Sequence, residues 1–337
     1  MHPEAPLHWE SATATGVRLV PPGPRVADRA ATAAIRELYA LAARAEGLVA
    51  ETARISAPRN TAPVVVVDRT AWLRHNVESM RTIIPGQDQP TVTGRIAGAE
   101  IGSVLAWLST KVLGQFDIFA PADTVPHGRL MLVVPNIVHA ETELGVNPHD
   151  FRLWVCLHEE THRVQFTAHP WLRDYLRDQA EVVAHLTDLR TPAIGDLARM
   201  VTGGEHRISL LDLLPDTDHV RTTIERVTAV MSLLEGHADV IMDRVGPEVI
   251  GSIAQIRARF ERRRDSHKGI DRVLRRVLGL EQKLAQYRDG AKFCNQVIAV
   301  LGVDGLNRVF TSPNTLPTLA EIHDPDLWIG RMTARSR

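Results

Sequence analysis

The feature that most constrains this chain is the stretch LWVCLHEETHRVQF, Leu153–Phe166, in which two histidines lie four residues apart. Ahead of it, Asn147 is a typical N-cap and Pro148 suits the first helical position. Behind it, Pro170 disfavours helix at the preceding residue. These signals predict a helix of about 20 residues. Apolar residues flank the pair on both sides, so the helix is expected to be largely buried.

His158 and His162 are one helical turn apart and share one face. At that spacing, two imidazole nitrogens can reach one zinc ion at about 2.0–2.1 Å. Glu159 is offset by about 100° around the helix, so it cannot easily chelate with them but can reach water at the metal. The pattern H-E-x-x-H therefore indicates two ligands and one general base. A chance pattern is the alternative, because the chain has 15 histidines.

A catalytic zinc usually has three protein ligands and an open position. A third histidine six residues after the second would complete one known pattern, but Ala168 stands there. The helix-like segment Val230–Pro247 offers Glu235, and a carboxylate among apolar residues needs a partner or a metal. Glu235 is therefore favoured, with His237 as the competing ligand and a helix with exposed acids as the non-functional alternative. Asp239, one turn later, is predicted to hydrogen-bond the far nitrogen of a ligating histidine.

The remaining chain predicts many helices and little sheet. Residues 26–55 and 70–83 have helical patterns, whereas Pro63–Arg69 and Gly128–Val138 are short apolar runs typical of buried strands. Nearly everything from residue 170 to about residue 306 has a helical pattern.

A glycine stripe lies between the two predicted strands. Gly94, Gly98 and Gly102 recur every four residues and share one helical face. Each interior glycine costs a helix about 1 kcal/mol, so the stripe predicts close packing against another element. It does not have the G-x-G-x-x-G spacing of a phosphate-binding loop.

Composition excludes several classes of protein. The 337 residues are 44% hydrophobic and 23% charged with a net charge of −1, which argues against a nucleic-acid or membrane coat. Two cysteines are too few for a disulfide framework, and Cys156 is expected to be a small core residue. The sequence shows no signal peptide and no membrane span, so a cytoplasmic location is expected. The basic stretch Arg257–Arg276 is read as a solvated helix face, with an acidic partner as the alternative.

Three stretches together resemble the actinobacterial zincin-like family of zinc metallopeptidases, of the type with a glutamate ligand. They are FRLWVCLHEETHRVQF, LLEGHADVIMDRV and KLAQYRDGAKF. Members of that family are often linked to the biosynthesis of a deazaflavin coenzyme. The resemblance extends from about Trp9 to Arg331 and implies an α+β, predominantly helical, zincin-like fold with a small mixed sheet beside the active-site helix. It also implies that His158, His162 and Glu235 hold one zinc ion, with Glu159 as the catalytic residue.

The proline pattern and the resemblance together predict a domain organisation. A proline-rich segment, 1–25, would precede a single catalytic domain, 26–311, and a segment that wraps the surface, 312–337. The second histidine and the glutamate are farther apart than in compact members of the group. A helical insertion at about 172–218 is therefore expected.

The predicted activity is zinc-dependent hydrolysis of an amide, most simply a peptide bond. Glu159 would take a proton from water and deliver it to the leaving amine. Tyr287 and His237 are further candidates for stabilising the oxyanion. By fold analogy, the strand Leu130–Val134 is expected to align an extended peptide by edge pairing. The alternatives are a non-hydrolytic zinc-binding protein and a hydrolase of a small amide metabolite.

Overall fold

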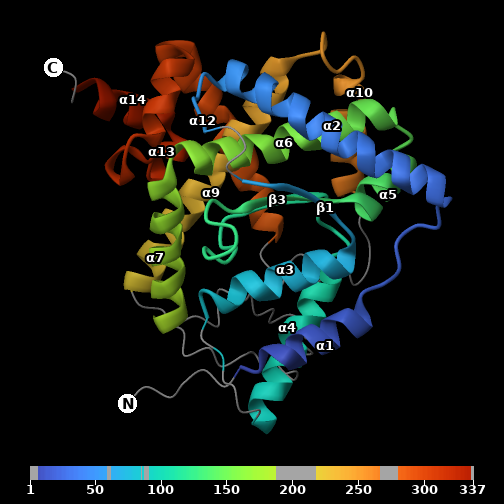
Figure 1. Cartoon of the computed structure of the whole chain (residues 1–337). Helices are drawn as coiled ribbons and strands as arrows, with labels where there is room; N and C mark the ends of the chain where they lie inside the picture. Colours follow the sequence, from blue (N-terminus) through green and yellow to red (C-terminus); the bar gives the residue numbers. More distant parts are fainter. Residues whose placement is uncertain are drawn as a thin grey trace. The chain divides into compact units, whose positions relative to one another are not determined.

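The computed structural model confirms a mostly helical α+β architecture (Figure 1). It describes residues 7–58, 62–84, 86, 91–186, 218–265 and 280–334. The chain divides into two compact units. The first contains residues 1–49, 57–167 and 245–261, and the second contains residues 50–56, 168–244 and 262–337.

The described helices include several that the sequence analysis did not predict: one at the N-terminus, one that begins within the predicted strand Gly128–Val138, and two near the C-terminus. The described helices are α1 (Trp9–Leu19), α2 (Asp28–Ala53), α3 (Arg69–Arg81), α4 (Val92–Leu108), α5 (Val134–Leu144), α6 (Pro148–Ala168), α7 (Pro170–Leu186), α9 (Asp218–Val245), α10 (Ile253–Asp265), α12 (Leu280–Asn307), α13 (Leu319–His323) and α14 (Pro325–Ala334). Short 3-10 turns lie at Arg308–Phe310 and Pro313–Thr315. None of the described helices is long and apolar enough to cross a membrane.

A three-stranded mixed sheet lies in the first unit. Strand β3 (Arg129–Val133) is central, with β1 (Val64–Val67) parallel on one side and β2 (Gly114–Asp117) antiparallel on the other. All five residues of β3 are buried, which explains why the four that follow Arg129 are all apolar. Because β3 is central, the expectation that it aligns a peptide by edge pairing is wrong.

The second strand is also shorter than predicted. The expected run Gly128–Val138 becomes a strand only as far as Val133, and α5 begins at Val134 with Pro135 in its first turn. A proline fits the first turn of a helix, where its missing N–H has no intrahelical partner. The apolar residues after Val133 therefore belong to the helical period rather than to the strand.

The glycine stripe packs against α1, a helix that the sequence analysis did not predict (Figure 1). A Cβ atom at Gly98 would lie 2.3 Å from the backbone oxygen of His8, and one at Gly102 would lie 2.2 Å from that of Ala12. No side chain fits at such distances, so these glycines allow the two helix backbones to touch. The predicted close packing is confirmed.

Helix α6 begins and ends where the sequence predicts. Asn147 Oδ1 accepts a hydrogen bond from the Asp150 backbone N–H at 3.1 Å, as an N-cap does. The helix ends at Ala168, and α7 starts at Pro170. The expected insertion at 172–218 falls partly on α7, and residues 187–217 lie outside the described part of the chain.

The C-terminal part of the second unit is helical and anchored by aromatic residues. Trp328 of α14 is fully buried and packs edge-on against Phe293 of α12, with ring centroids 5.7 Å apart. Its indole N–H donates to the Thr315 backbone oxygen at 2.9 Å.

A buried carboxylate, Glu321, holds the neighbouring turn together. It accepts from the Thr318 backbone N–H at 2.8 Å and from two nitrogens of Arg331 at 2.6 and 3.0 Å.

Replacing Glu321 with glutamine should make the free energy of unfolding less dependent on pH. Burial acts to raise the pKa of this carboxyl, but hydrogen bonds from Arg331 and Thr318 outweigh it and hold the pKa below the usual 4.5. Its ionised form therefore stabilises the native state above that value, and the contribution is lost as pH falls through the lowered pKa. We expect E321Q to cost about 1.5–3 kcal/mol near neutral pH and less below pH of about 4.

Urea denaturation at several pH values measures this effect. The exposed Glu51 of α2 provides a matched control, E51Q. An equal loss of stability in E321Q at every pH would contradict the assignment of the effect to the charged carboxylate.

Candidate metal centre

The two motif histidines interrupt a stretch of α6 that is otherwise buried. From Leu153 to Thr167, every residue of α6 is buried except His158 and His162, which are half-buried. Their Nε2 atoms lie 3.2 Å apart, and the rings meet edge-on with centroids separated by 4.7 Å. The predicted one-turn spacing therefore brings the two nitrogens together.

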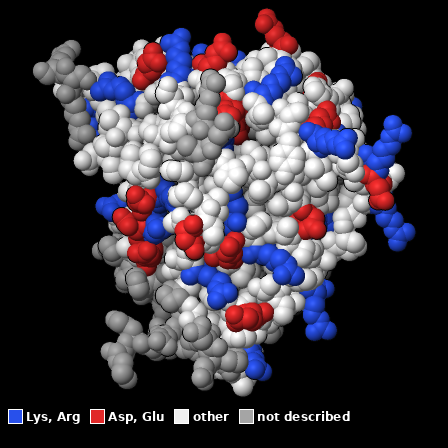
Figure 2. Space-filling model, viewed as in Figure 1, with Lys and Arg blue, Asp and Glu red and all other residues white. Residues whose placement is uncertain are grey.

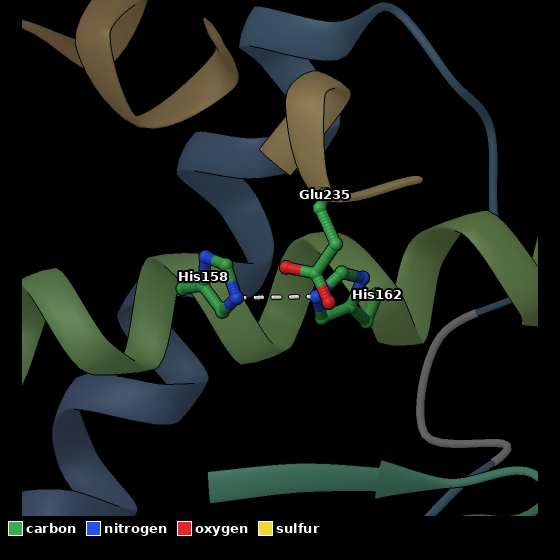
Figure 3. A group of neighbouring side chains, drawn as sticks. All are labelled: His158, His162 and Glu235. Carbon is green, nitrogen blue, oxygen red and sulfur yellow. Dashed lines mark hydrogen bonds between the residues drawn. The ribbon is translucent and has the colours of Figure 1, made fainter. Parts of the chain in front are cut away.

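Glu235 of α9 belongs, with the two histidines, to a group of side chains that could hold a metal ion. One ligand atom from each of His158, His162 and Glu235 lies within 4.8 Å of the other two. Figure 3 shows the glutamate side chain pointing from α9 toward both imidazoles. Within the described residues, this is the group of three such side chains that could hold a metal ion.

The geometry and the donor types fit zinc. Two nitrogens bound tetrahedrally at about 2.0–2.1 Å from zinc are about 3.3 Å apart, close to the separation of the two Nε2 atoms. Two imidazole lone pairs at this distance repel one another unless a proton or a cation lies between them. Two nitrogens and one carboxylate oxygen form a typical donor set of catalytic zinc sites.

Gln165 orients one of the two imidazoles, and the sequence analysis missed this role. Its Oε1 lies 2.9 Å from His162 Nδ1, and the glutamine is fully buried. An amide oxygen can only accept, so the proton lies on Nδ1 and the Nε2 lone pair is left for a metal. The signal available in the sequence was its position three residues after His162, on the same side of the helix.

Glu159 is buried and points to the sheet rather than to solvent. It is 6% exposed, and its side chain lies against Gly114 at the start of β2. The 100° offset predicted from the helical period therefore separates this carboxylate from the two imidazoles that it follows in sequence.

An ion-pair network anchors α6 beside the motif. Arg163 donates to Glu160 through Nε at 2.6 Å and reaches Glu46 of α2 through Nη2 at 2.8 Å. Burial raises the pKa of Glu160 to about 7, although Arg163 counteracts it.

Cys156 is 1% exposed. Burial is the main cause that raises the pKa of its thiol, and the charge of Glu160 adds to it. The prediction that Cys156 is a core residue is confirmed.

The other predicted residues of α9 have different surroundings. His237 is fully buried and packs edge-on against Phe310, with ring centroids 5.3 Å apart. It is not a member of the three-donor group. Asp239 is half-buried, and its charge contributes to raising the pKa of the Cys294 thiol, after burial as the main cause. The side chain of Tyr287 lies outside the described part of the chain.

Close packing fixes the backbone of α9 next to Glu235. A Cβ atom at Gly236 would lie 2.1 Å from the carbonyl carbon of Gly290 on α12, and one at Gly290 would lie 1.8 Å from the Ser232 oxygen. Neither position accepts a side chain without a shift of the helices. The two glycines therefore set the approach of α9 to α12 at the residue that follows Glu235.

Comparison with known proteins agrees with this donor set. Residues 7–329 match the family described as zincin-like metallopeptidase. The chain belongs to that family. Membership of this family implies a zinc hydrolase.

A solved structure is similar over nearly the whole zincin-like chain. It is a crystal structure of a candidate hydrolase with a novel fold from Chloroflexus aurantiacus, 30% identical in sequence, with a TM-score of 0.70. The match covers 97% of this chain and 99% of that one. No curated protein matches the sequence.

Replacing Gln165 with methionine should weaken zinc binding by about 10–100-fold, as expected when a partner of a ligating histidine is lost. Methionine has a similar volume but no strong acceptor, so His162 is no longer held in the tautomer that exposes Nε2. Competition with a chelator measures the zinc affinity. T167V removes a buried hydroxyl from the same helix and should leave zinc affinity unchanged. Native affinity in Q165M would contradict the orienting role.

Proposed function

We propose that this zincin-like protein is a zinc-dependent peptidase in which His158, His162 and Glu235 hold one zinc ion and Glu159 is the general base. The observation that carries the proposal is the group of these three donors, together with a buried glutamate that directly follows the first histidine and is not part of the group. A structural zinc site usually fills all four positions, often with cysteine. Here three donors and an additional glutamate favour catalysis.

Each residue has a defined part in this mechanism. When bound, zinc supplies a Lewis acid that polarises a carbonyl and acidifies water. Glu159 accepts the proton of the attacking water and transfers it to the leaving nitrogen, so one carboxylate acts first as base and then as acid. Gln165 keeps His162 in the ligating tautomer. Asp239 is proposed to act in the same way on a ligating histidine.

Two other functions remain alternatives, and the described residues favour them less. A non-hydrolytic zinc-binding protein gives no role to a general base at Glu159. A hydrolase of a small amide metabolite would use the same chemistry, and only the substrate distinguishes it from a peptidase. The finer resemblance, to the actinobacterial members linked to a deazaflavin coenzyme, is compatible with either substrate.

The predicted acidic partner at Arg257–Arg276 has less support. Arg259 donates to the backbone oxygens of Leu144 and Gly145, both at 2.6 Å, and so stabilises the end of α5. On the face shown in Figure 2, basic and acidic side chains are interspersed. Residues 266–279 lie outside the described part of the chain, so a test of this partner needs binding data at several salt concentrations.

Replacing Glu159 with glutamine should abolish most hydrolysis while zinc is retained. Loss of a general base typically costs about 10²–10⁴-fold in rate. The measurement is cleavage of a peptide library by native and E159Q protein, with the zinc content of both determined by mass spectrometry. E248Q, at an exposed glutamate, is the matched control.

The outcomes separate the three functions. Peptide cleavage that is lost in zinc-loaded E159Q supports the peptidase. Cleavage of small amides but not of peptides would favour the metabolite hydrolase. Zinc binding without hydrolysis across both panels would favour the binding protein, and failure of the native protein to hold supplied zinc would overturn all three.

Exchange of Glu235 and His237 for alanine tests the third ligand. We expect E235A to lower zinc affinity by more than the about 10–100-fold typical of outer partners. H237A should lower stability instead, because it removes a buried ring from its contact with Phe310. Zinc titration and thermal unfolding of both variants measure the two effects. The reverse order of zinc affinities would assign the ligand to His237.

A further inference from the structure

Side chains of β2 contact the motif helix from one face of the strand and α3 from the other. Phe116 points to α6, where its ring stacks on Phe166 with centroids 6.0 Å apart. Gly114, two residues earlier, has the same direction and lies against Glu159. The face of β2 that meets α6 thus consists of one aromatic ring and one position without a side chain.

The opposite face of β2 is held by hydrogen bonds. Gln115 Oε1 accepts from the Trp72 indole N–H at 2.8 Å. Asp117 is 2% exposed and its Oδ2 accepts from Ser79 Oγ at 2.7 Å and from Arg129 Nε at 3.0 Å. Together with the pairing to β3, these contacts fix the strand on three sides.

There is no space for a side chain at position 114, because Glu159 occupies it. A Cβ atom there would lie 2.5 Å from Glu159 Cγ, 2.7 Å from Cδ and 2.9 Å from Oε1. Real Cβ atoms do not approach other atoms so closely, so one partner would have to move. The strand is fixed, whereas the glutamate carboxylate is the end of a flexible side chain. The backbone at Gly114 does not have a positive φ, so alanine adds volume there rather than backbone strain.

We propose that Gly114 is a positioning residue, whose missing side chain determines where the Glu159 carboxylate lies. The proposal rests on the proposed role of Glu159 as general base. A methyl group at this position displaces the carboxylate while the histidines, on another face of α6, stay in place. A displacement of about 1 Å at a reacting group can cost about 100-fold in rate.

The test compares G114A with G251A, since a Cβ atom at Gly251 would meet nothing within 4 Å. We expect G114A to retain zinc and to lose about 10–100-fold in kcat with little change in KM. G251A should behave as the native protein. Equal kcat in G114A and native protein would overturn the proposal.

A crystal structure of G114A gives a readout that does not depend on activity. The Glu159 carboxylate should lie away from its native position, with or without zinc. If the native protein hydrolyses nothing, the proposed function fails, yet this displacement still tests the positioning role. An unmoved carboxylate would overturn it.

A double variant covers the case in which G114A is too unstable to assay. Aspartate at position 159 is one methylene shorter and so withdraws from the added methyl group. If the clash with Glu159 is the cause, G114A/E159D should recover the urea midpoint lost in G114A, and the two substitutions should be non-additive. No recovery would place the cause elsewhere in β2 and overturn the proposal.

Discussion

Helix α6 is buried along nearly its whole length, so its polar side chains must find partners inside the protein. Glu160 and Arg163 meet this demand by pairing with one another and with Glu46. Thr161 and Thr167 donate to backbone oxygens of their own helix. At the candidate centre, Gln165 holds His162 and Glu159 lies against β2. A buried helix whose charged side chains are paired in this way has few alternative positions. The two histidines are therefore presented with fixed geometry at the only gap in its burial between Leu153 and Thr167.

Local signals in the sequence predicted the parts of the fold that depend on local physics. The Asn147 cap, the four-residue histidine spacing and the close contact made by Gly98 and Gly102 all follow from helical periodicity and capping. The end of β3 was missed because an apolar run that passes from strand to helix has the same composition on both sides of Val133. Periodicity alone does not locate such a boundary.

The missed parts of the candidate site are contacts between residues distant in sequence. Nothing near Gly114 indicates that its missing side chain faces Glu159, 45 positions later in the numbering. Likewise, the apolar residues around Glu235 identified it as a carboxylate in need of a partner. They did not indicate that the next residue, Gly236, allows α9 to touch the backbone of Gly290. At both glycines a side chain would collide with a neighbouring residue, and single-sequence patterns seldom distinguish such a glycine from one in a turn.

The chain's two cysteines lie in different compact units, Cys156 on α6 in the first and Cys294 on α12 in the second. Burial protects both thiols and raises the pKa of each, so neither is a ready nucleophile in the native state. A thiol reagent can therefore modify each cysteine only when the surrounding unit opens. Each unit therefore contains one cysteine whose labelling rate reports how often that unit opens. Mass spectrometry can measure the two rates separately and so show whether the units open together or independently.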